Sequence, residues 1–207
     1  MVANILFMDE MPEFERQVLE ALRQPGETSR TFNQAPRLLQ PVLLRQQMQS
    51  LVETCKKNAA DEMEQFLRKL SKVPDDKLTW SPTPTAKSSM RIAAHTALYA
   101  GRFARMIEAR ALDRPENLDE WLAQRSAEEI AITTRDEVES VFRKGTREVL
   151  AALDSLTPEE IEGRLDSGQG WSAPMTWLMN LPANHTGWHA AQIDYLQTCW
   201  DDQEVYF

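Results

Sequence analysis

The sequence contains few of the residues that interrupt helices or build sheets. Only 7 glycines occur among its 207 residues, and no stretch alternates Val, Ile or Thr with polar residues as a half-buried strand would. The long segments are instead rich in Ala, Leu, Glu, Gln, Arg and Met, which favour the α-helix. With 42% hydrophobic and 27% charged residues, the chain has the balance of a globular protein. We therefore expect an all-α fold, and the length suits one domain with a small appendage.

The chain also lacks an excess of positive charge and any long apolar run. Its 23 basic residues against 32 acidic residues give a net charge of −9, which would repel nucleic acids and anionic lipid surfaces. No run approaches the roughly 20 apolar residues that span a bilayer, and the first residues lack the basic start of a signal peptide. The two cysteines, Cys55 and Cys199, have no CxxC spacing, and each is predicted to be a small buried residue. These absences predict a cytoplasmic protein with neither a nucleic-acid nor a membrane partner.

Turn-forming residues separate the first part of the chain from the rest. A short helical stretch near residues 12–23 is followed by Gln-Pro-Gly-Glu-Thr-Ser-Arg at residues 24–30 and by Pro36. We therefore expect residues 1–40 to form an N-terminal extension with a short helix and a linker. Residues 41–207 are expected to form the main domain.

Four long segments of this main domain carry apolar residues at the three- and four-residue steps of an amphipathic helix. The first runs from Leu44 to just before Pro74, the second follows Ser88 as an N-cap, and the third follows a capping box at Thr134. Pro182 is expected to kink the fourth helix or to mark its start. The fourth helix is expected to bury a stripe formed by Leu178, Leu181, His185, Trp188, Gln192, Tyr195 and Cys199.

Shorter pieces are predicted between these helices. Residues 111–133 are expected to form short helical pieces over one end of the bundle, with Asn117 and Ser126 as caps and Glu129 three residues after Ser126. Thr157 is expected to cap another brief turn, before a glycine-rich loop.

The three histidines of the chain are spaced so that they can meet. His185 and His189 are four residues apart, so on one helix their side chains share a face with Cβ atoms about 6 Å apart. His95 lies on the inward face of a different predicted helix, and the sequence has no fourth histidine. Three neutral imidazoles around one divalent metal would leave a coordination position open, as catalytic sites do. The alternative is a pair of histidines that shares a solvated face by chance.

Four other residues could assist such a site, and each also has a plainer interpretation. Gln192, one turn beyond the histidine pair, could orient a ligand or a bound water, or it could be a partly buried polar residue. Tyr99, one turn beyond the third histidine, could offer its hydroxyl or simply fill the core. Glu62 could accept a hydrogen bond from a ligating imidazole, or it could be solvated. Gly187 could make room for a neighbouring helix or a substrate, or it could be a chance glycine.

Three stretches of the sequence share a pattern with a known family. They are residues 73–84, which read Val-Pro-Asp-Asp-Lys-Leu-Thr-Trp-Ser-Pro-Thr-Pro, then Ser88 seven residues before His95, and then residues 185–196 with their HxxxH pair. This pattern resembles the DinB/YfiT-like superfamily over about residues 41–200. The resemblance implies a four-helix bundle in which His95, His185 and His189 hold nickel, zinc or a similar ion.

The same resemblance implies a set of functions. Characterised members use the metal to activate a low-molecular-weight thiol, such as bacillithiol, mycothiol or glutathione, for transfer to an electrophile, or they act as isomerases. We therefore expect a thiol-dependent S-transferase that acts on a small-molecule substrate. A metal-dependent hydrolase, and a non-catalytic protein that binds a metal or small ligand in a stress response, are the alternatives. Similar bundles often pair, so a homodimer is a further expectation.

Overall fold

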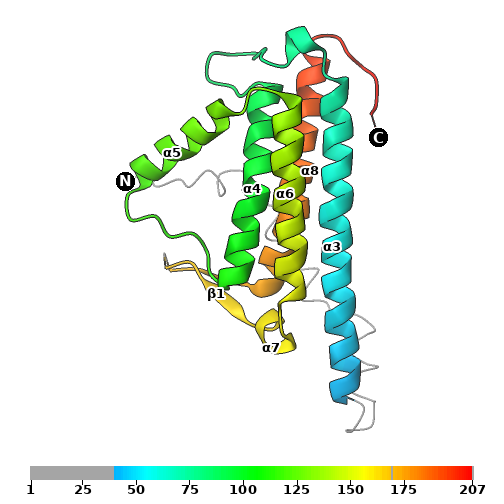
Figure 1. Ribbon diagram of the computed structural model, residues 1–207, viewed down its shortest axis with the longest axis vertical. Coiled ribbons are helices and arrows are strands. Elements are labelled where there is room, and N and C mark those ends of the chain that lie inside the picture. Colours follow the sequence, from blue (N-terminus) through cyan, green and yellow to red (C-terminus); the bar gives the residue numbers. More distant parts are fainter. Residues whose placement is uncertain (1–39, 169, 207) are drawn as a thin grey trace. The chain divides into compact units, whose positions relative to one another are not determined.

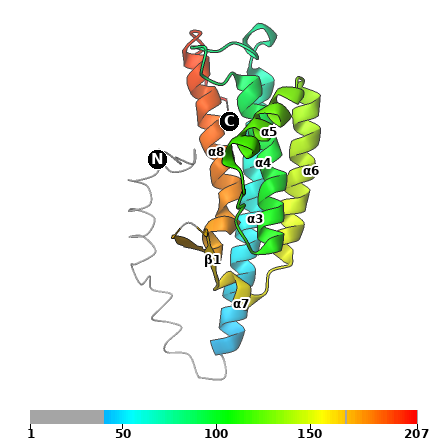
Figure 2. The same ribbon diagram turned by 90° about the vertical axis from the view of Figure 1, so that its left-hand side faces the viewer.

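Four long helices make up most of the fold, as the spacing of the apolar residues predicts. The computed structural model describes residues 40–168 and 170–206, with side chains from residue 43 on. The long helices are α3 (Gln40–Lys72), α4 (Ser89–Ala109), α6 (Arg135–Asp154) and α8 (Met175–Thr198). Helices α4, α6 and α8 run side by side, with α4 in contact with both of the others (Figures 1 and 2). The predicted all-α bundle is thereby confirmed.

The predicted extension falls largely outside this description. Residues 1–39 lie outside the described residues, and with them lies the short helix predicted near residues 12–23. The compact unit that carries the bundle extends from Met48 to Phe207. The division of the chain at residue 40 therefore stays a prediction.

The core of the bundle is apolar and includes aromatic contacts between helices. Phe66 of α3 and Phe142 of α6 meet edge to face, with ring centres 5.7 Å apart. Helices α4 and α6 approach closely at Gly145, where a Cβ atom would lie only 2.7 Å from the backbone nitrogen of Gly101. Glycine is therefore required at position 145, because any larger residue would push the two helices apart.

Three predicted helix starts are found where the sequence placed them. The Ser88 hydroxyl accepts a hydrogen bond from the backbone of Arg91 and caps α4. Thr134 forms a capping box at the start of α6, and Thr157 forms another at the start of the short helix α7 (Pro158–Ile161). These local signals fix where the helices begin.

The prediction for residues 111–133 needs correction. They contain a single helix, α5 (Leu118–Ala131), which Asn117 caps as predicted and which contacts α4. Ser126 lies inside this helix rather than at its start. The helix continues because residues 118–131 contain no proline or glycine to end it.

The buried stripe predicted for α8 is wrong in its second half. Tyr195 is 69% exposed, and Gln192 and Cys199 are exposed as well. The residues that face the core there are Thr186, Ala190, Ile193, Leu196 and Gln197. Because several of these are small or polar, the apolar periodicity of the true core face is weak. Pro182 also does not mark the start of the helix, which begins seven residues earlier at Met175.

Short elements join the long helices. The stretch between α3 and α4 contains one 3₁₀ turn, η1 (Asp75–Lys77). Strands β1 (Arg164–Asp166) and β2 (Ser172–Pro174) form an antiparallel hairpin before α8. No strand was predicted, because three-residue strands are too short to show alternation. Within the described ranges, no helix combines the length and the apolar character that crossing a membrane requires.

Candidate metal centre

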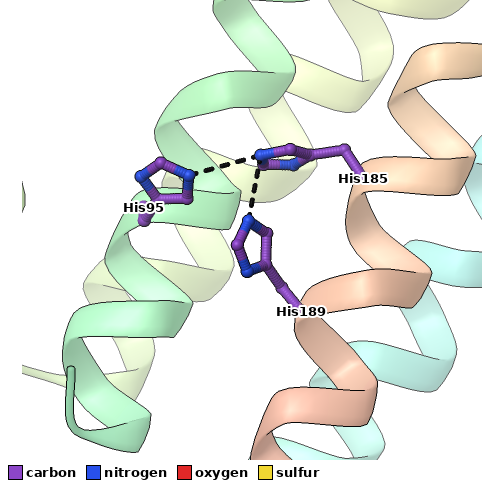
Figure 3. Close-up of side chains that lie close together, drawn as sticks. All are labelled: His95, His185 and His189. Atoms are coloured by element: carbon purple, nitrogen blue, oxygen red, sulfur yellow. Dashed lines mark hydrogen bonds between the residues drawn. The ribbon is translucent and has the colours of Figure 1, made fainter. Parts of the chain in front are cut away.

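Three histidine side chains meet between α4 and α8. His95 comes from α4, and His185 and His189 come from successive turns of α8. Figure 3 shows the rings of His95 and His189 both directed at the ring of His185. Nε2 of His185 lies 3.3 Å from Nε2 of His95 and 3.1 Å from Nε2 of His189. All the candidate donor atoms lie within 4.8 Å of one another, so the fold brings the three predicted residues together.

Hydrogen bonds determine which nitrogen carries the proton in two of the rings. Nδ1 of His95 lies 2.7 Å from Oε1 of Glu129 and 3.2 Å from Nζ of Lys87. The shorter contact is with the carboxylate, which only accepts, so His95 donates through Nδ1 to Glu129. Nδ1 of His189 likewise donates to Oε1 of Gln192 over 2.7 Å. In the neutral rings of His95 and His189, Nε2 therefore presents a lone pair toward His185.

Burial keeps these imidazoles uncharged. It lowers the pKa of His185 well below its usual value, and the neighbouring histidines add to the effect. Burial also lowers the pKa of His189 to about 4. For His95 burial lowers the pKa even though the hydrogen bond to Glu129 opposes it. Neutral nitrogen donors are the form of histidine that binds metal ions.

A divalent cation fits this set of donors better than hydrogen bonds between the rings do. A proton on Nε2 of His185 can be shared with only one of the two facing lone pairs, so the other nitrogen–nitrogen contact stays repulsive. Tetrahedral zinc with bonds of about 2.0–2.1 Å holds its nitrogens about 3.3 Å apart, close to the two distances from Nε2 of His185 to Nε2 of His95 and His189. Three such donors leave a coordination position for another ligand.

The other residues singled out in the sequence lie around the histidines in different ways. Gln192 is bonded to His189, and the Tyr99 ring packs 4.3 Å from the His95 ring and 5.0 Å from the His185 ring, centre to centre. The carboxylate of Glu62 instead faces Gly187. A Cβ atom added to Gly187 would lie 3.4 Å from Oε2 of Glu62.

Gly187 faces away from the centre. It is about 200° around the helix from His185, so it belongs to a different face of α8 from the histidine pair. The room at Gly187 is used by Glu62 of α3, a neighbouring helix.

Sequence reasoning missed the part played by Glu129 of α5. Its side chain is only 5% exposed and, besides His95, it accepts hydrogen bonds from Lys87 at 3.0 Å and Arg91 at 3.3 Å. Burial raises the pKa of Glu129, but the hydrogen bonds from His95 and Lys87 outweigh burial and bring the pKa to about 2. The carboxylate therefore stays ionised. In the sequence, its position three residues after Ser126 suggested a capping box, which hid the contact with His95.

The two cysteines differ from each other. Cys55 is buried as predicted, and burial raises the pKa of its thiol to about 11, so it stays protonated and unreactive. Cys199 is exposed, which corrects the prediction for that residue. It is the C-cap of α8.

Comparison with known families gives one match over most of the chain. The family model described as "DinB superfamily" matches residues 57–193, a range that includes all three histidines. A second model, described as "Magnesium chelatase, subunit ChlI", matches only residues 2–37, which is too small a part to assign a family. The curated proteins include no match to this chain.

Two solved structures share the fold at low sequence identity. A DinB-like protein of Bacillus subtilis, YjoA, is 15% identical with a TM-score of 0.53, and the match covers 74% of this chain and 96% of that one. A mycothiol-dependent maleylpyruvate isomerase is 12% identical with a TM-score of 0.54, over 69% of this chain and 60% of that one. At these identities the likeness shows the fold alone.

Proposed function

This chain belongs to the DinB superfamily, and on that premise we propose that it is a metal-dependent enzyme that transfers a low-molecular-weight thiol to a small electrophile. The observation that supports this proposal most strongly is the convergence of three Nε2 atoms from His95, His185 and His189. A divalent ion bound there would supply Lewis-acid chemistry that lowers the pKa of a thiol and favours its anion.

The remaining residues of the centre act on the three imidazoles. Glu129 accepts the Nδ1 proton of His95 and holds that ring in place, and Gln192 does the same for His189. The carboxylate of Glu129 also makes the His95 ring a stronger donor, because it favours positive charge on the imidazole. Tyr99 packs against the rings of His95 and His185.

Two considerations support the choice of cofactors. Imidazole nitrogens suit zinc and nickel, so we propose one of these two ions. One solved structure of the same fold is described as mycothiol-dependent, which supports a low-molecular-weight thiol as the second cofactor. Three protein donors leave room for that thiol at the metal.

The proposal is tested with untagged protein loaded with zinc or nickel. It is mixed with bacillithiol, mycothiol or glutathione and with a chromogenic electrophile such as chlorodinitrobenzene. One thiol should be consumed at least 100-fold faster by the wild type than by His185→Ala, whereas Asn184→Ala, an exposed neighbour on α8, should match the wild type. Equal rates for His185→Ala and the wild type would refute the proposal.

The same assay separates the alternatives. Turnover of an ester or amide substrate without any thiol would indicate a metal-dependent hydrolase. Metal binding without turnover of any kind would indicate a non-catalytic protein. The predicted homodimer is tested by light scattering on the full chain and on a chain lacking residues 1–40, and a monomer in both cases would contradict it.

A further inference from the structure

We infer that Arg102 forms a carboxylate-binding subsite beside the metal centre, and that Glu128 of α5 occupies this subsite until a ligand carboxylate displaces it. The inference rests on the proposed function, since the ligand is the electrophile or the thiol that the metal centre uses. Either molecule could carry the carboxylate, and the chemistry of recognition is the same for both.

The first observation is the burial of Arg102 with part of its hydrogen-bonding capacity unused. Its side chain is 2% exposed, and its Nη2 atom donates to Oε2 of Glu128. Its Nη1 atom is buried and has no hydrogen-bond partner among the described residues. Burying a cation is costly unless its donors are paired, so a purely structural arginine would be expected to use both ends of its guanidinium group.

The second observation is the position of Arg102 next to the three histidines. Its guanidinium carbon lies 4.5 Å from the centre of the Tyr99 ring, and that ring stacks on His185 with centres 5.0 Å apart. One aromatic ring therefore separates the guanidinium group from a candidate metal ligand. A small molecule bound at the metal could reach Arg102 with a carboxylate on a short chain.

A second cation adjoins this position. Arg125 of α5 lies over the Trp121 ring, and its nearest carboxylates, those of Asp113 and Glu128, are 3.6 and 3.8 Å away. Burial, together with the charge of Arg102, lowers the pKa of Arg125. Two guanidinium groups thus lie near each other, and Glu128 is the carboxylate that both of them approach.

The third observation is that the Glu128 side chain is partly exposed and holds Arg102 by one contact, so that a ligand carboxylate can displace it from Arg102. Its side chain is 35% exposed, in contrast to the buried neighbour Glu129, and it contacts only one of the two terminal nitrogens of Arg102. A planar guanidinium group can hold a carboxylate with two parallel hydrogen bonds. A ligand carboxylate that used both Nη1 and Nη2 would therefore exchange a one-ended contact for a two-ended one.

The test measures binding of succinate, a simple carboxylate, by calorimetry at pH 7 with and without metal. Wild-type protein should bind succinate, and it should not bind the neutral analogue succinamide. Arg102→Gln should weaken succinate binding at least 10-fold. Glu128→Gln should strengthen it several-fold, because the competing carboxylate is gone. Arg143→Gln, which removes an arginine of α6 from ion pairs with Glu64 and Glu139, should bind as the wild type does.

The outcomes distinguish a binding role from a structural one. If neither the wild type nor Glu128→Gln binds succinate, or if Arg102→Gln binds it as tightly as the wild type, the inference is overturned. If Arg102→Gln does not fold, the comparison of succinate binding between Glu128→Gln and the wild type still tests the inference. Succinate binding in a protein without thiol-transfer activity would refute the proposed function alone, and thiol transfer without succinate binding would refute the subsite alone.

Kinetics on the metal-loaded enzyme then assign the carboxylate to one of the two molecules. If the electrophile carries it, Arg102→Gln raises the KM for the electrophile and leaves the KM for the thiol unchanged. If the thiol carries it, the effects are reversed. An unchanged KM for both would contradict the inference.

Discussion

The two sides of helix α4 are built from opposite kinds of residue. Toward α6 it presents small side chains, and Ala100 and Gly101 lie against Gly145 so closely that a Cβ atom at position 145 does not fit. Toward α5 it presents His95 and Arg102, which pair with Glu129 and Glu128 of that helix. The one residue of α5 that is buried is an acid, Glu129.

This difference indicates that one side of α4 determines the stability of the fold and the other side carries the charged and metal-binding groups. The contact between α4 and α6 fixes the backbone through close packing, which tolerates little change. The contact between α4 and α5 depends on ion pairs and hydrogen bonds, so it can hold charged and metal-binding groups that an apolar core would exclude. We therefore expect changes on the α6 side to alter stability, and changes on the α5 side to alter metal binding.

The largest effect is expected from Gly145→Ala. The new Cβ atom would lie 2.7 Å from the backbone nitrogen of Gly101 and 2.9 Å from the Cβ atom of Ala100, so the helices must separate. We predict a loss of about 3 kcal/mol in the free energy of unfolding, measured by urea denaturation.

Gly101→Ala is the matched control for that change. Its Cβ atom would meet only the ends of two flexible side chains, those of Glu148 at 3.4 Å and Arg105 at 3.8 Å. Because alanine favours a helix over glycine, this variant should gain up to about 1 kcal/mol. A loss of similar size in both variants would show that the close approach of the helices is not the cause.

The histidines should make the metal-free protein sensitive to acid. Burial lowers the pKa of His189 from 6.5 to about 4, so between these values the unfolded chain binds a proton that the folded chain excludes. The stability is then intact above pH 6.5 and is lost as the pH falls toward 4. With a chelator present, we predict a fall of about 2 kcal/mol over this range, measured by urea denaturation at several pH values.

Removal of the ring provides the control for this pH dependence. His189→Asn should make the profile shallower between pH 6.5 and 4, because asparagine does not titrate, while His95 and His185, whose pKa values burial also lowers, keep part of the slope. Carboxylates titrate lower, and Glu129 with a pKa of about 2 loses its charge only below this window. An identical slope in the variant and the wild type would rule out His189 as the source.

A smaller effect is expected on metal affinity from Glu129→Gln. The amide can still accept the Nδ1 proton of His95, but it no longer carries the charge that makes the ring a stronger donor. We predict about 10-fold weaker zinc binding, or about 1.4 kcal/mol, in competition with a chromophoric chelator. Glu120→Gln, an exposed change in the first turn of the same helix, should leave the affinity unchanged. Equal affinity for Glu129→Gln and the wild type would place Glu129 outside the centre.

The smallest effect is expected at the start of α6. Thr134→Ala removes the side chain that accepts a hydrogen bond from the backbone of Glu137, and it should cost about 1 kcal/mol of stability. Zinc affinity should not change. Thr85→Ala, at an exposed position in the connector, should stay within about 0.5 kcal/mol of the wild type. A change in zinc affinity for Thr134→Ala would mean that the two sides of α4 are coupled.

Local patterns predicted much of this molecule because their causes lie within a few residues. The caps at Ser88, Thr134 and Thr157 depend on contacts across one helical turn. The pairing of His185 with His189 depends only on the pitch of a helix. The spacing of the apolar residues around His95 was enough to place it on the inward face of a different helix.

Features that depend on how distant segments pack were not predictable in this way. Glu129 meets His95 only because α5 lies against α4, and nothing near it in the sequence states that contact. The core face of α8 includes Thr186 and Gln197, whose polarity hides it from a search for apolar periodicity. The hairpin before α8 has strands of three residues, which are too short for any pattern.

The most direct test of the central claim is X-ray absorption spectroscopy of the untagged, zinc-loaded protein. We predict one zinc per chain with about three imidazole nitrogens at about 2.0 Å, and loss of the ion in His185→Ala. A protein that binds no zinc, or that binds it equally well without His185, would contradict the account.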